Sequence, residues 1–284
     1  LRIVGAAVIH YEHGHALRTT PEPCDTDTDK PAAVGEIGPR HVKLKRGLRS
    51  TAPHPQALIT GKPIDSKPLP ESLLALGEAV LQDQPGFEAA RALLFRSAAA
   101  SAASGALVRP GEAPEHALAR LTGELTGSVI AVQGPPGSGK TYQAARMICE
   151  LLRQGKRVGV TANSHAVIKH LLEQVCVQAA AADEPELVRA LHLEADEDSD
   201  KVWPFRIDNN KDKARADLEA GRVNLLGGTA WTWARDDYAA SVDALVIDEA
   251  GQMSLANALA VARAGRGLVL FGDPAQLEQP QKGV

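Results

Sequence analysis

Residues 134–141 read Gly134-Pro135-Pro136-Gly137-Ser138-Gly139-Lys140-Thr141, the complete G-x-x-x-x-G-K-[ST] pattern of a phosphate-binding loop. In this pattern, glycines let successive backbone N–H groups turn inward around phosphate oxygens. Lys140 supplies a positive charge, and the Thr141 hydroxyl is a ligand for Mg²⁺. The residues expected to contact a bound nucleotide are Gly134, Pro135, Gly137, Ser138, Gly139, Lys140 and Thr141.

The sequence on both sides of the loop fits the strand and the helix that such a loop connects. An apolar run from Val129 to Val132 precedes the loop. Behind it, apolar residues recur with helical spacing at Ala144, Ala145, Ile148, Leu151 and Leu152. The alternative is a glycine-rich turn that only caps a helix. The strand and helix patterns around the loop favour the phosphate-binding interpretation.

The composition, with 44% hydrophobic and 23% charged residues, is ordinary for a soluble globular protein. The net charge of −4 provides no general attraction to nucleic acid, so such a partner requires a local basic surface. The three cysteines form no C-x-x-C pair, and neither an apolar run of about 18 residues nor a basic leader is present. We therefore expect a reduced, cytoplasmic protein without a membrane partner. Because the chain begins at Leu1 and not at Met, we also expect a fragment.

Prolines divide the chain, since ten of the 18 lie between Pro21 and Pro85. Proline at that density breaks helices, so we expect a β-rich region, such as a small barrel, over residues 1–70. Its strand candidates are Leu1–His10 and His41–Arg46. Helical spacing predicts two helices over residues 71–100, in a connector that covers 71–114. A further helix over Glu115–Leu125 then opens a third domain, residues 115–284.

Strand and helix patterns alternate from Ser128 onward, which predicts an α/β fold with a parallel sheet covered by helices on both faces. The candidate strands are Val129–Gln133, Arg157–Thr161, Val223–Leu226, Ala244–Asp248 and Gly267–Phe271. The segment Asp183–Asp200 carries eight carboxylates and is typical of a solvated helix and loop.

Two adjacent acids end one of these apolar strands. Asp248 at the strand tip is suited to binding Mg²⁺, and Glu249 to polarising a water that attacks a γ-phosphate in line. Gln276 follows another apolar strand, and its amide can bond both to a γ-phosphate oxygen and to that water. Taken alone, each set also fits a polar surface turn after a strand.

Five segments of the chain carry a resemblance to a known family. In order, they read GPPGSGKT, VTANSHAVIKHLL, GGTAW, VIDEAGQMS and GDPAQL. They look like motifs I, Ia, Ic, II and III of superfamily 1 helicases, and are most similar to the 5′→3′ (1B) branch. Closer still, the chain resembles bacterial proteins that join an N-terminal RecB-like nuclease to such a helicase. The match covers residues 128–280, and the first hundred residues match only loosely.

This resemblance implies a RecA-like first motor domain that binds ATP and Mg²⁺ at the tips of its strands. It implies catalytic roles for Lys140, Glu249 and Gln276, with Thr141 and Asp248 as metal ligands. It also implies contacts with single-stranded DNA or RNA, made by Thr161, Asn163, Ser164, His165 and Thr229. Because the chain stops at Val284, we expect a second RecA-like domain, and the arginines that complete the ATP site, to be missing from it. A nuclease domain upstream in the full-length protein is a further expectation. Within this chain, Asp65-Ser66-Lys67 has the D-x-K spacing of a nuclease motif, but the sequence offers no further acidic residues that would complete such a site.

Several of these residues have a plain structural alternative. Asn163 or Ser164 fits a helix cap before a helix that begins near His165 as well as it fits a phosphate contact. Trp231 and Trp233 fit a hydrophobic core better than base stacking. The basic stretch Arg40–Arg46 fits either a nucleic-acid contact or a solvated edge strand.

A cluster of three histidines near Cys24 matches no paired zinc spacing; its members are His10, His13 and His15.

Taken together, the five motifs favour the ATP-hydrolysing motor domain of a single-stranded nucleic-acid translocase or helicase. Two alternatives stay open: a P-loop ATPase that acts on protein, and a non-catalytic nucleotide-binding module.

Overall fold

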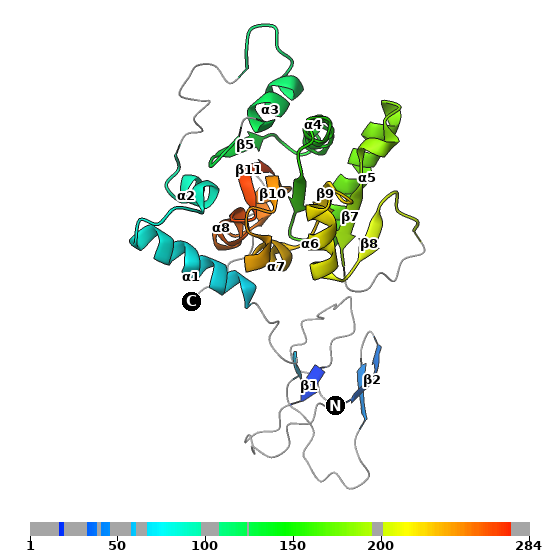
Figure 1. Cartoon of the computed structure of the whole chain (residues 1–284). Helices are drawn as coiled ribbons and strands as arrows, with labels where there is room; N and C mark the ends of the chain where they lie inside the picture. Colours follow the sequence, from blue (N-terminus) through cyan, green and yellow to red (C-terminus); the bar gives the residue numbers. More distant parts are fainter. Residues whose placement is uncertain are drawn as a thin grey trace. The chain divides into compact units, whose positions relative to one another are not determined.

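The computed structural model describes residues 17–19, 33–38, 41–45, 58–60, 67–97, 108–123, 125–194 and 201–273. Contacts divide the chain into two compact units, Leu1–Asp65 and Ser66–Val284 (Figure 1). The predicted boundaries at residues 70 and 114 stay predictions. The predicted strand Leu1–His10, the His10–Cys24 cluster and Gln276 lie outside the described residues.

In its described residues, the first unit contains two pairs of antiparallel strands. Strand β1 (Leu17–Thr19) pairs with β4 (Leu58–Thr60), and β2 (Ala33–Gly38) pairs with β3 (His41–Lys45). Strand β3 confirms the strand expected at His41–Arg46. The β2–β3 register shifts between Val34 and Glu36, a bulge that adds local twist.

The second unit is built on a seven-stranded parallel sheet with the strand order β5-β11-β10-β6-β9-β7-β8. Its strands are β5 (Val129–Gln133), β6 (Val158–Thr161), β7 (Ala190–Leu193), β8 (Arg206–Asp208), β9 (Leu225–Gly227), β10 (Val242–Ile247) and β11 (Gly265–Gly272). The five predicted strands of this region are all present. The expected solvated segment Asp183–Asp200 is wrong in its centre, because β7 is buried there along its whole length.

Helices cover both faces of this sheet, as predicted (Figure 1). The helices are α1 (Pro68–Leu81), α2 (Glu88–Leu94), α3 (Pro114–Gly123), α4 (Lys140–Arg153), α5 (His165–Ala181), α6 (Lys211–Glu219), α7 (Ala230–Trp233) and α8 (Leu255–Ala262). The two helices expected over 71–100 are α1 and α2, and the helix expected from Glu115 is α3. Among the described residues, no helix is both long and apolar enough to cross a membrane.

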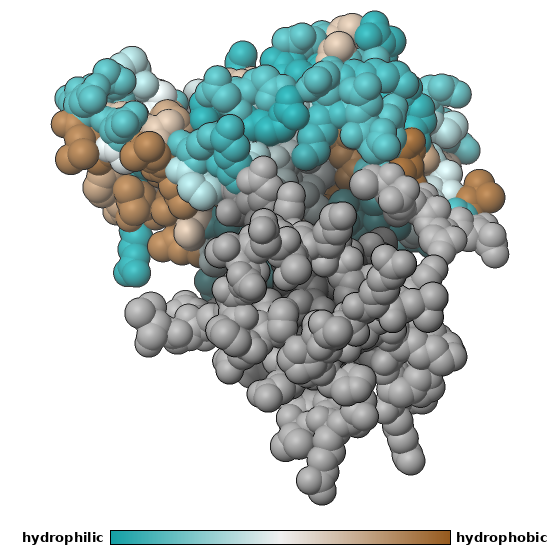
Figure 2. All heavy atoms as spheres, turned by 90° about the horizontal axis from the view of Figure 1, so that it is seen from below, coloured by the Kyte–Doolittle hydropathy of each residue, from teal (hydrophilic) through white to brown (hydrophobic). Residues whose placement is uncertain are grey.

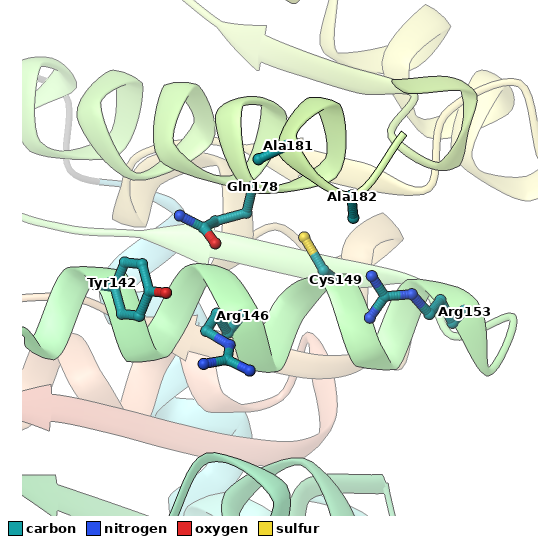
Figure 3. A pocket seen from close by; sticks show the side chains of 7 residues that line it. All are labelled: Tyr142, Arg146, Cys149, Arg153, Gln178, Ala181 and Ala182. Atoms are coloured by element: carbon teal, nitrogen blue, oxygen red, sulfur yellow. The ribbon is translucent and has the colours of Figure 1, made fainter. Parts of the chain in front are cut away.

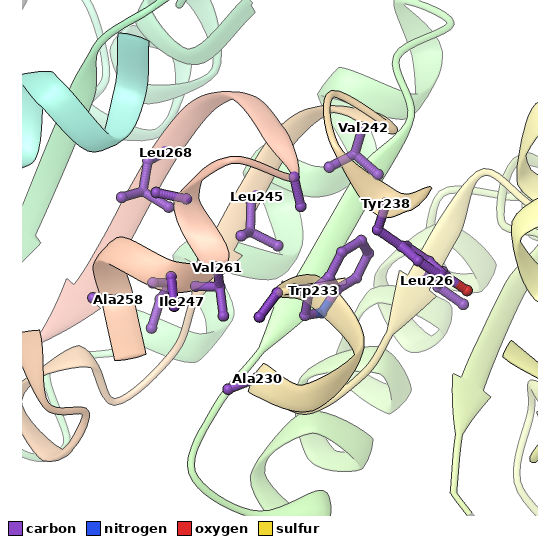
Figure 4. Packing of buried hydrophobic residues seen from close by; sticks show 14 of the residues in the cluster. Leu226, Ala230, Trp233, Tyr238, Val242, Leu245, Ile247, Ala258, Val261 and Leu268 are labelled. Carbon is purple, nitrogen blue, oxygen red and sulfur yellow. The ribbon is translucent and has the colours of Figure 1, made fainter. Parts of the chain in front are cut away.

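Alternation along the central strands creates two hydrophobic cores. In β10, Leu245 and Ile247 point to the core shared with α1, α2, α6, α7 and α8, whereas Val246 points to the core shared with α3, α4 and α5. The run Ala244–Ile247 is apolar at every position because successive side chains face opposite sides of the sheet and each side is covered by a core. Burying each large side chain stabilises the fold by about 1.5–3 kcal/mol. Figure 4 shows Leu245 and Ile247 packed with Trp233 from α7 and Val261 from α8.

Helix α1 belongs to the sheet-containing unit, because its buried Ser72 hydroxyl donates to the Ala260 carbonyl oxygen of α8 at 2.7 Å. Two large apolar side chains of α1 are exposed to solvent, Leu74 at 64% and Leu81 at 88%. Figure 2 shows apolar side chains gathered on the side where Figure 1 places α1.

Candidate nucleotide-binding site

The predicted phosphate-binding loop joins the end of β5 to the first residue of α4, and residues 135–139 are exposed. Gly137 and Gly139 have φ angles of +74° and +83°, which residues with a side chain rarely adopt. Gly139 is the residue that precedes the helix. Backbone N–H groups at a helix start that follows such a loop form a binding site for phosphate oxygens. The loop therefore has the backbone shape that the pattern predicts.

The Lys140 ammonium lies within the loop itself. Its Nζ donates to the Gly134 carbonyl oxygen at 2.7 Å and to the Pro135 carbonyl oxygen at 3.1 Å. These bonds keep the positive charge beside the residues expected to surround phosphate. A hydrogen bond from an ammonium to a charged phosphate oxygen is stronger than one to a neutral carbonyl oxygen, so a bound phosphate would compete with these two carbonyls for Lys140.

Strand order brings the other predicted elements to the same edge of the sheet. Strand β11 lies between β5 and β10, and the Gly134 N–H donates to the Gly272 carbonyl oxygen at 3.2 Å. All three strands are parallel, so their carboxyl ends meet at one edge, where ligands of open α/β sheets bind. This edge carries the loop after β5, Asp273 after β11 and Asp248 after β10.

Asp248 is a buried carboxylate, 3% exposed, that follows β10 directly. Its backbone N–H donates to the Thr161 carbonyl oxygen of β6 at 2.9 Å. Burial raises the pKa of the Asp248 carboxyl; the bond from the Glu249 N–H and the charge of Lys140 oppose this shift. A bound divalent cation would favour the charged carboxylate, which makes Asp248 a suitable ligand.

Glu249 combines an unusual backbone with an unpaired carboxylate oxygen. Its φ and ψ of 50° and 45° lie in the left-handed region, which is uncommon outside glycine and is often found at functional sites. Its N–H donates to Asp248 Oδ1 at 2.9 Å. Within the described part of the chain, Glu249 Oε2 is buried and has no hydrogen-bond partner. A buried acceptor without a donor is free to take a hydrogen bond from a reactant or water.

These side chains fit a magnesium nucleotide. Thr141 offers a hydroxyl, Asp248 a buried carboxylate, and Lys140 a positive charge beside the loop. Hard oxygen ligands of this kind suit Mg²⁺, which is commonly bound by one or two protein oxygens together with phosphates. The fit rests on the buried carboxylate of Asp248 and on the unpaired oxygen of Glu249.

The residues predicted to contact nucleic acid lie beside this edge, with different exposures. Asn163 and Ser164 are exposed after β6, and α5 begins at His165, as expected. Ser164 Oγ accepts the Val167 N–H at 3.3 Å, so the helix-cap interpretation is confirmed for this residue. The Asn163 side-chain amide donates to the Gln252 carbonyl oxygen in the 3₁₀ helix η4 (Ala250–Gln252), which directly follows Glu249.

Two other predicted contact residues, and one tryptophan, are less accessible. Thr161 is fully buried, and among the described residues its hydroxyl has no hydrogen-bond partner. Thr229 is half-buried and precedes α7. Trp233 is fully buried, and its Nε1 donates to the carbonyl oxygens of Val160 and Gly228 at 3.1 and 2.9 Å. The core interpretation of Trp233 is therefore confirmed.

Sequence reasoning missed a polar cluster formed by His165, His192 and Glu194. His165 Nδ1 lies 2.9 Å from His192 Nε2, and Lys169 Nζ lies 2.9 Å from Glu194 Oε2. Burial, followed by the nearby charges of His165 and Lys169, lowers the pKa of His192 to about 3. His192 lies within the apolar run Ala190–Leu193 that forms β7, and a polar residue in a buried strand could have indicated this cluster. The acidic residues on both sides of the run led instead to the prediction of a solvated segment.

A cavity of about 310 Å³ lies elsewhere, between α4 and α5 (Figure 3). Its lining includes Arg146, Cys149 and Arg153 of α4 and Gln178 of α5. Arg153 is paired with Glu184 at 2.7 Å, which compensates the charge of this arginine. None of the loop residues lines this cavity, and it is separate from the predicted nucleotide site.

Three solved structures illustrate what the chain is similar to. Arterivirus nonstructural protein 10, a helicase in complex with DNA, aligns at 16% identity over 58% of this chain and 33% of its own, with a TM-score of 0.35. The DUF1998 helicase MrfA bound to DNA aligns at 13% identity over 51% and 20%, with a TM-score of 0.36. A nuclease-deletion mutant of the Type ISP restriction-modification enzyme LlaGI, with a DNA substrate mimic, aligns at 15% identity over 58% and 17%, with a TM-score of 0.38. The aligned part of this chain spans a third or less of each of these structures, and no curated protein sequence matches it.

A protein-family model, that of the AAA domain, matches residues 115–284. This match covers more than half of the chain and contains the loop after β5, Asp248 and Glu249. It agrees with the parallel sheet and the phosphate-binding loop described above. The chain belongs to the AAA domain family.

Proposed function

We propose that this chain is the ATP-hydrolysing motor domain of a single-stranded nucleic-acid translocase or helicase. The observation that carries the proposal is the meeting of three elements at one sheet edge. They are the loop with Lys140, the buried Asp248 and the unpaired carboxylate of Glu249. This set matches the needs of phosphoryl transfer to water, in which a protein positions the reactants and neutralises developing charge.

Each residue has a separate task in the proposed reaction. The loop N–H groups and Lys140 bind the β- and γ-phosphates, while Thr141 and Asp248 hold Mg²⁺, which neutralises phosphate charge when it is bound. Glu249 accepts a hydrogen bond, and then a proton, from the attacking water through its unpaired Oε2. Gln276, on the segment that follows β11, is proposed to bond to the γ-phosphate.

Nucleic acid is proposed to act through the exposed turn between β6 and α5. Asn163 lies in this turn, and its hydrogen bond to Gln252 reaches the residues that directly follow Glu249. Contact of a nucleic-acid phosphate with Asn163 competes for the same amide and changes the support of η4. Such a contact therefore has a physical route to the residue proposed to activate water.

Stimulation of ATP hydrolysis by nucleic acid tests this proposal. We expect the purified chain to hydrolyse ATP faster with an unstructured single-stranded oligonucleotide than without it, and to lose most of that stimulation in Asn163→Ala. Because Asn163→Ala also removes the side-chain bond to Gln252, the stimulation is taken for each variant as the ratio of its rate with the oligonucleotide to its own basal rate. Lys140→Ala should hydrolyse no ATP, either with or without the oligonucleotide. This variant controls for a contaminating ATPase.

Two outcomes would redirect the assignment. Basal hydrolysis without any stimulation by DNA or RNA would support an ATPase that acts on protein. Nucleotide binding with no hydrolysis, under every condition, would support a non-catalytic nucleotide-binding module.

A further inference from the structure

We propose that His165, His192 and Glu194 form a binding site for one first-row transition-metal ion, with Zn²⁺ as its first candidate. The cluster combines the first residue of α5 with His192 of β7 and with Glu194, the residue that follows this strand, and α5 contacts β7 on one face of the sheet (Figure 1). One donor atom from each of the three residues lies within 4.8 Å of the other two. Two imidazoles and a carboxylate are a donor set that binds zinc in proteins.

The distances between the donor atoms fit a single ion. His165 Nδ1 lies 2.9 Å from His192 Nε2 and 3.8 Å from Glu194 Oε1, and His192 Nε2 lies 3.7 Å from Glu194 Oε2. Zinc bonds to nitrogen and oxygen are about 2.0–2.2 Å long, so tetrahedral ligands lie roughly 3.3–3.6 Å apart. The two imidazole nitrogens lie closer together than this range, and each lies slightly farther than this range from a carboxylate oxygen of Glu194, Oε1 for His165 and Oε2 for His192. Small rotations of the His165 and Glu194 side chains would bring both nitrogens and one carboxylate oxygen to this spacing.

The surroundings of the cluster resemble those of an organised metal site. The His192 side chain is fully buried, and its Nδ1 lies against Gly227, where an added Cβ would be 3.0 Å away, so Nε2 is the nitrogen that faces the cluster. Lys169 Nζ holds Glu194 Oε2 at 2.9 Å, which orients the carboxylate from outside and leaves Oε1 toward His165. Outer contacts of this kind orient metal ligands and adjust their affinity.

One side of the cluster is accessible. The His165 side chain is 39% exposed, whereas that of Glu194 is 10% exposed. Three protein ligands with an open side leave a fourth position for water, which distinguishes this arrangement from a closed structural zinc site. An ion here would also link the start of α5 to β7, and so fix the turn that contains Asn163 and Ser164.

The competing explanation is a hydrogen bond between the two imidazoles, stabilised by Glu194 and Lys169 without any metal. The two explanations differ in one measurable respect. A hydrogen-bonded pair needs no ion, whereas the metal site predicts stoichiometric binding that depends on all three side chains.

Calorimetric titration of the metal-free full chain with ZnCl₂ tests the proposal. We expect His165→Asn and Glu194→Gln each to lose one bound equivalent, or to bind it at least tenfold more weakly than the wild type. His170→Asn is the matched control, because it makes the same change at an exposed position of the same helix and should keep that equivalent. All variants retain His10, His13, His15 and Cys24, so zinc bound there cancels in the comparison.

Thermal unfolding gives a second reading of the same site. Zinc should raise the melting temperature of the wild type and of His170→Asn, and raise it less in His165→Asn and Glu194→Gln, because an ion that binds only the folded state stabilises it. Circular dichroism before the titration establishes that each variant is folded. Equal zinc stoichiometry and affinity in the wild type and both cluster variants would leave only the hydrogen-bonded pair and overturn the proposal.

Discussion

Glu249 carries two local costs at one position, a left-handed backbone and a buried carboxylate oxygen that has no partner among the described residues. Each of these features lowers stability, by about 1–3 kcal/mol in comparable cases. Neighbouring Asp248 has no such backbone and is held by the bond that its Oδ1 accepts from the Glu249 N–H. Glu249 is therefore suited to activating water, because its backbone is strained and one carboxylate oxygen lacks a hydrogen bond within the described part of the chain. Asp248, whose Oδ1 accepts a hydrogen bond, is suited to holding a cation.

Two substitutions separate these roles. Lys140→Ala should abolish measurable binding of Mg·ATP, because it removes the charge that holds the phosphates. Glu249→Gln should keep that binding and lower the hydrolysis rate by roughly 10²–10⁴, the usual contribution of a positioned general base. Titration calorimetry and a phosphate-release assay measure the two effects. Unchanged nucleotide affinity in Lys140→Ala would show that the loop is not the binding site.

At the scale of elements, α7 is locked onto the sheet by the Trp233 indole. Its Nε1 donates to the carbonyl oxygens of Val160 and Gly228. Its ring packs edge-on against the ring of Tyr238, with 5.7 Å between the two ring centroids. Gly159 of β6 provides the room for this ring. A Cβ at residue 159 would lie 2.7 Å from the Trp233 ring and 2.9 Å from a Leu245 methyl.

Gly159→Ala should therefore destabilise the fold by about 1–3 kcal/mol, the usual cost of overpacking a dense core. Gly77→Ala is the matched control, because it adds the same methyl group within α1, where nothing lies within 4 Å. That change should raise stability by about 0.5–1 kcal/mol through helix propensity. Urea unfolding compares the two variants, and equal free energies of unfolding would contradict the packing argument.

The sheet edge at β8 depends on one carboxylate. Asp217 of α6 accepts Arg206 Nη2 of β8 at 2.9 Å and Arg222 Nε at 2.7 Å. The bonds from Arg206 and then Arg222 lower the pKa of Asp217 below its ordinary value of 3.8. The folded state therefore binds this proton more weakly than the unfolded state does.

It follows that this stabilisation is complete above about pH 4, the pKa of an unperturbed aspartate, and is lost as the pH falls through the lower pKa of the folded state. Asp217→Asn should lower the free energy of unfolding at pH 7 by about 1–2 kcal/mol, since neutral groups bond less strongly to arginine. The same variant should lose stability less steeply than the wild type below pH 4. Parallel curves of unfolding free energy against pH would refute this role.

At the scale of the whole molecule, a net charge of −4 makes any binding of nucleic acid depend on local basic groups. We expect weak, sequence-independent binding that decreases steeply with salt. Lys43 and Lys45 lie on β3, and replacing either lysine by alanine should reduce the slope of log affinity against log salt by roughly 0.7 on single strands, the value for one phosphate contact. An unchanged slope in both variants, with weaker binding by Asn163→Ala, would assign the contact to the sheet-containing unit alone.

The sequence determined those parts of this protein whose signals are local. The loop from Gly134 to Thr141, the apolar strand before Asp248 and the start of α5 at His165 were all predictable, because each depends on a few adjacent residues and on hydrogen bonds close in the chain. The capping role of Ser164 was one of two alternatives that the same local pattern allowed.

Only the tertiary structure decided what depends on distant pairing. The position of β11 between β5 and β10, the bond from Asn163 to Gln252 and the approach of His165 to His192 each join residues that local periodicity does not relate. Strand β7 escaped prediction because its apolar residues lie within an acidic segment. Order within a parallel sheet is set by how crossover helices bury their apolar faces, and that choice depends on the whole core rather than on any short stretch of sequence.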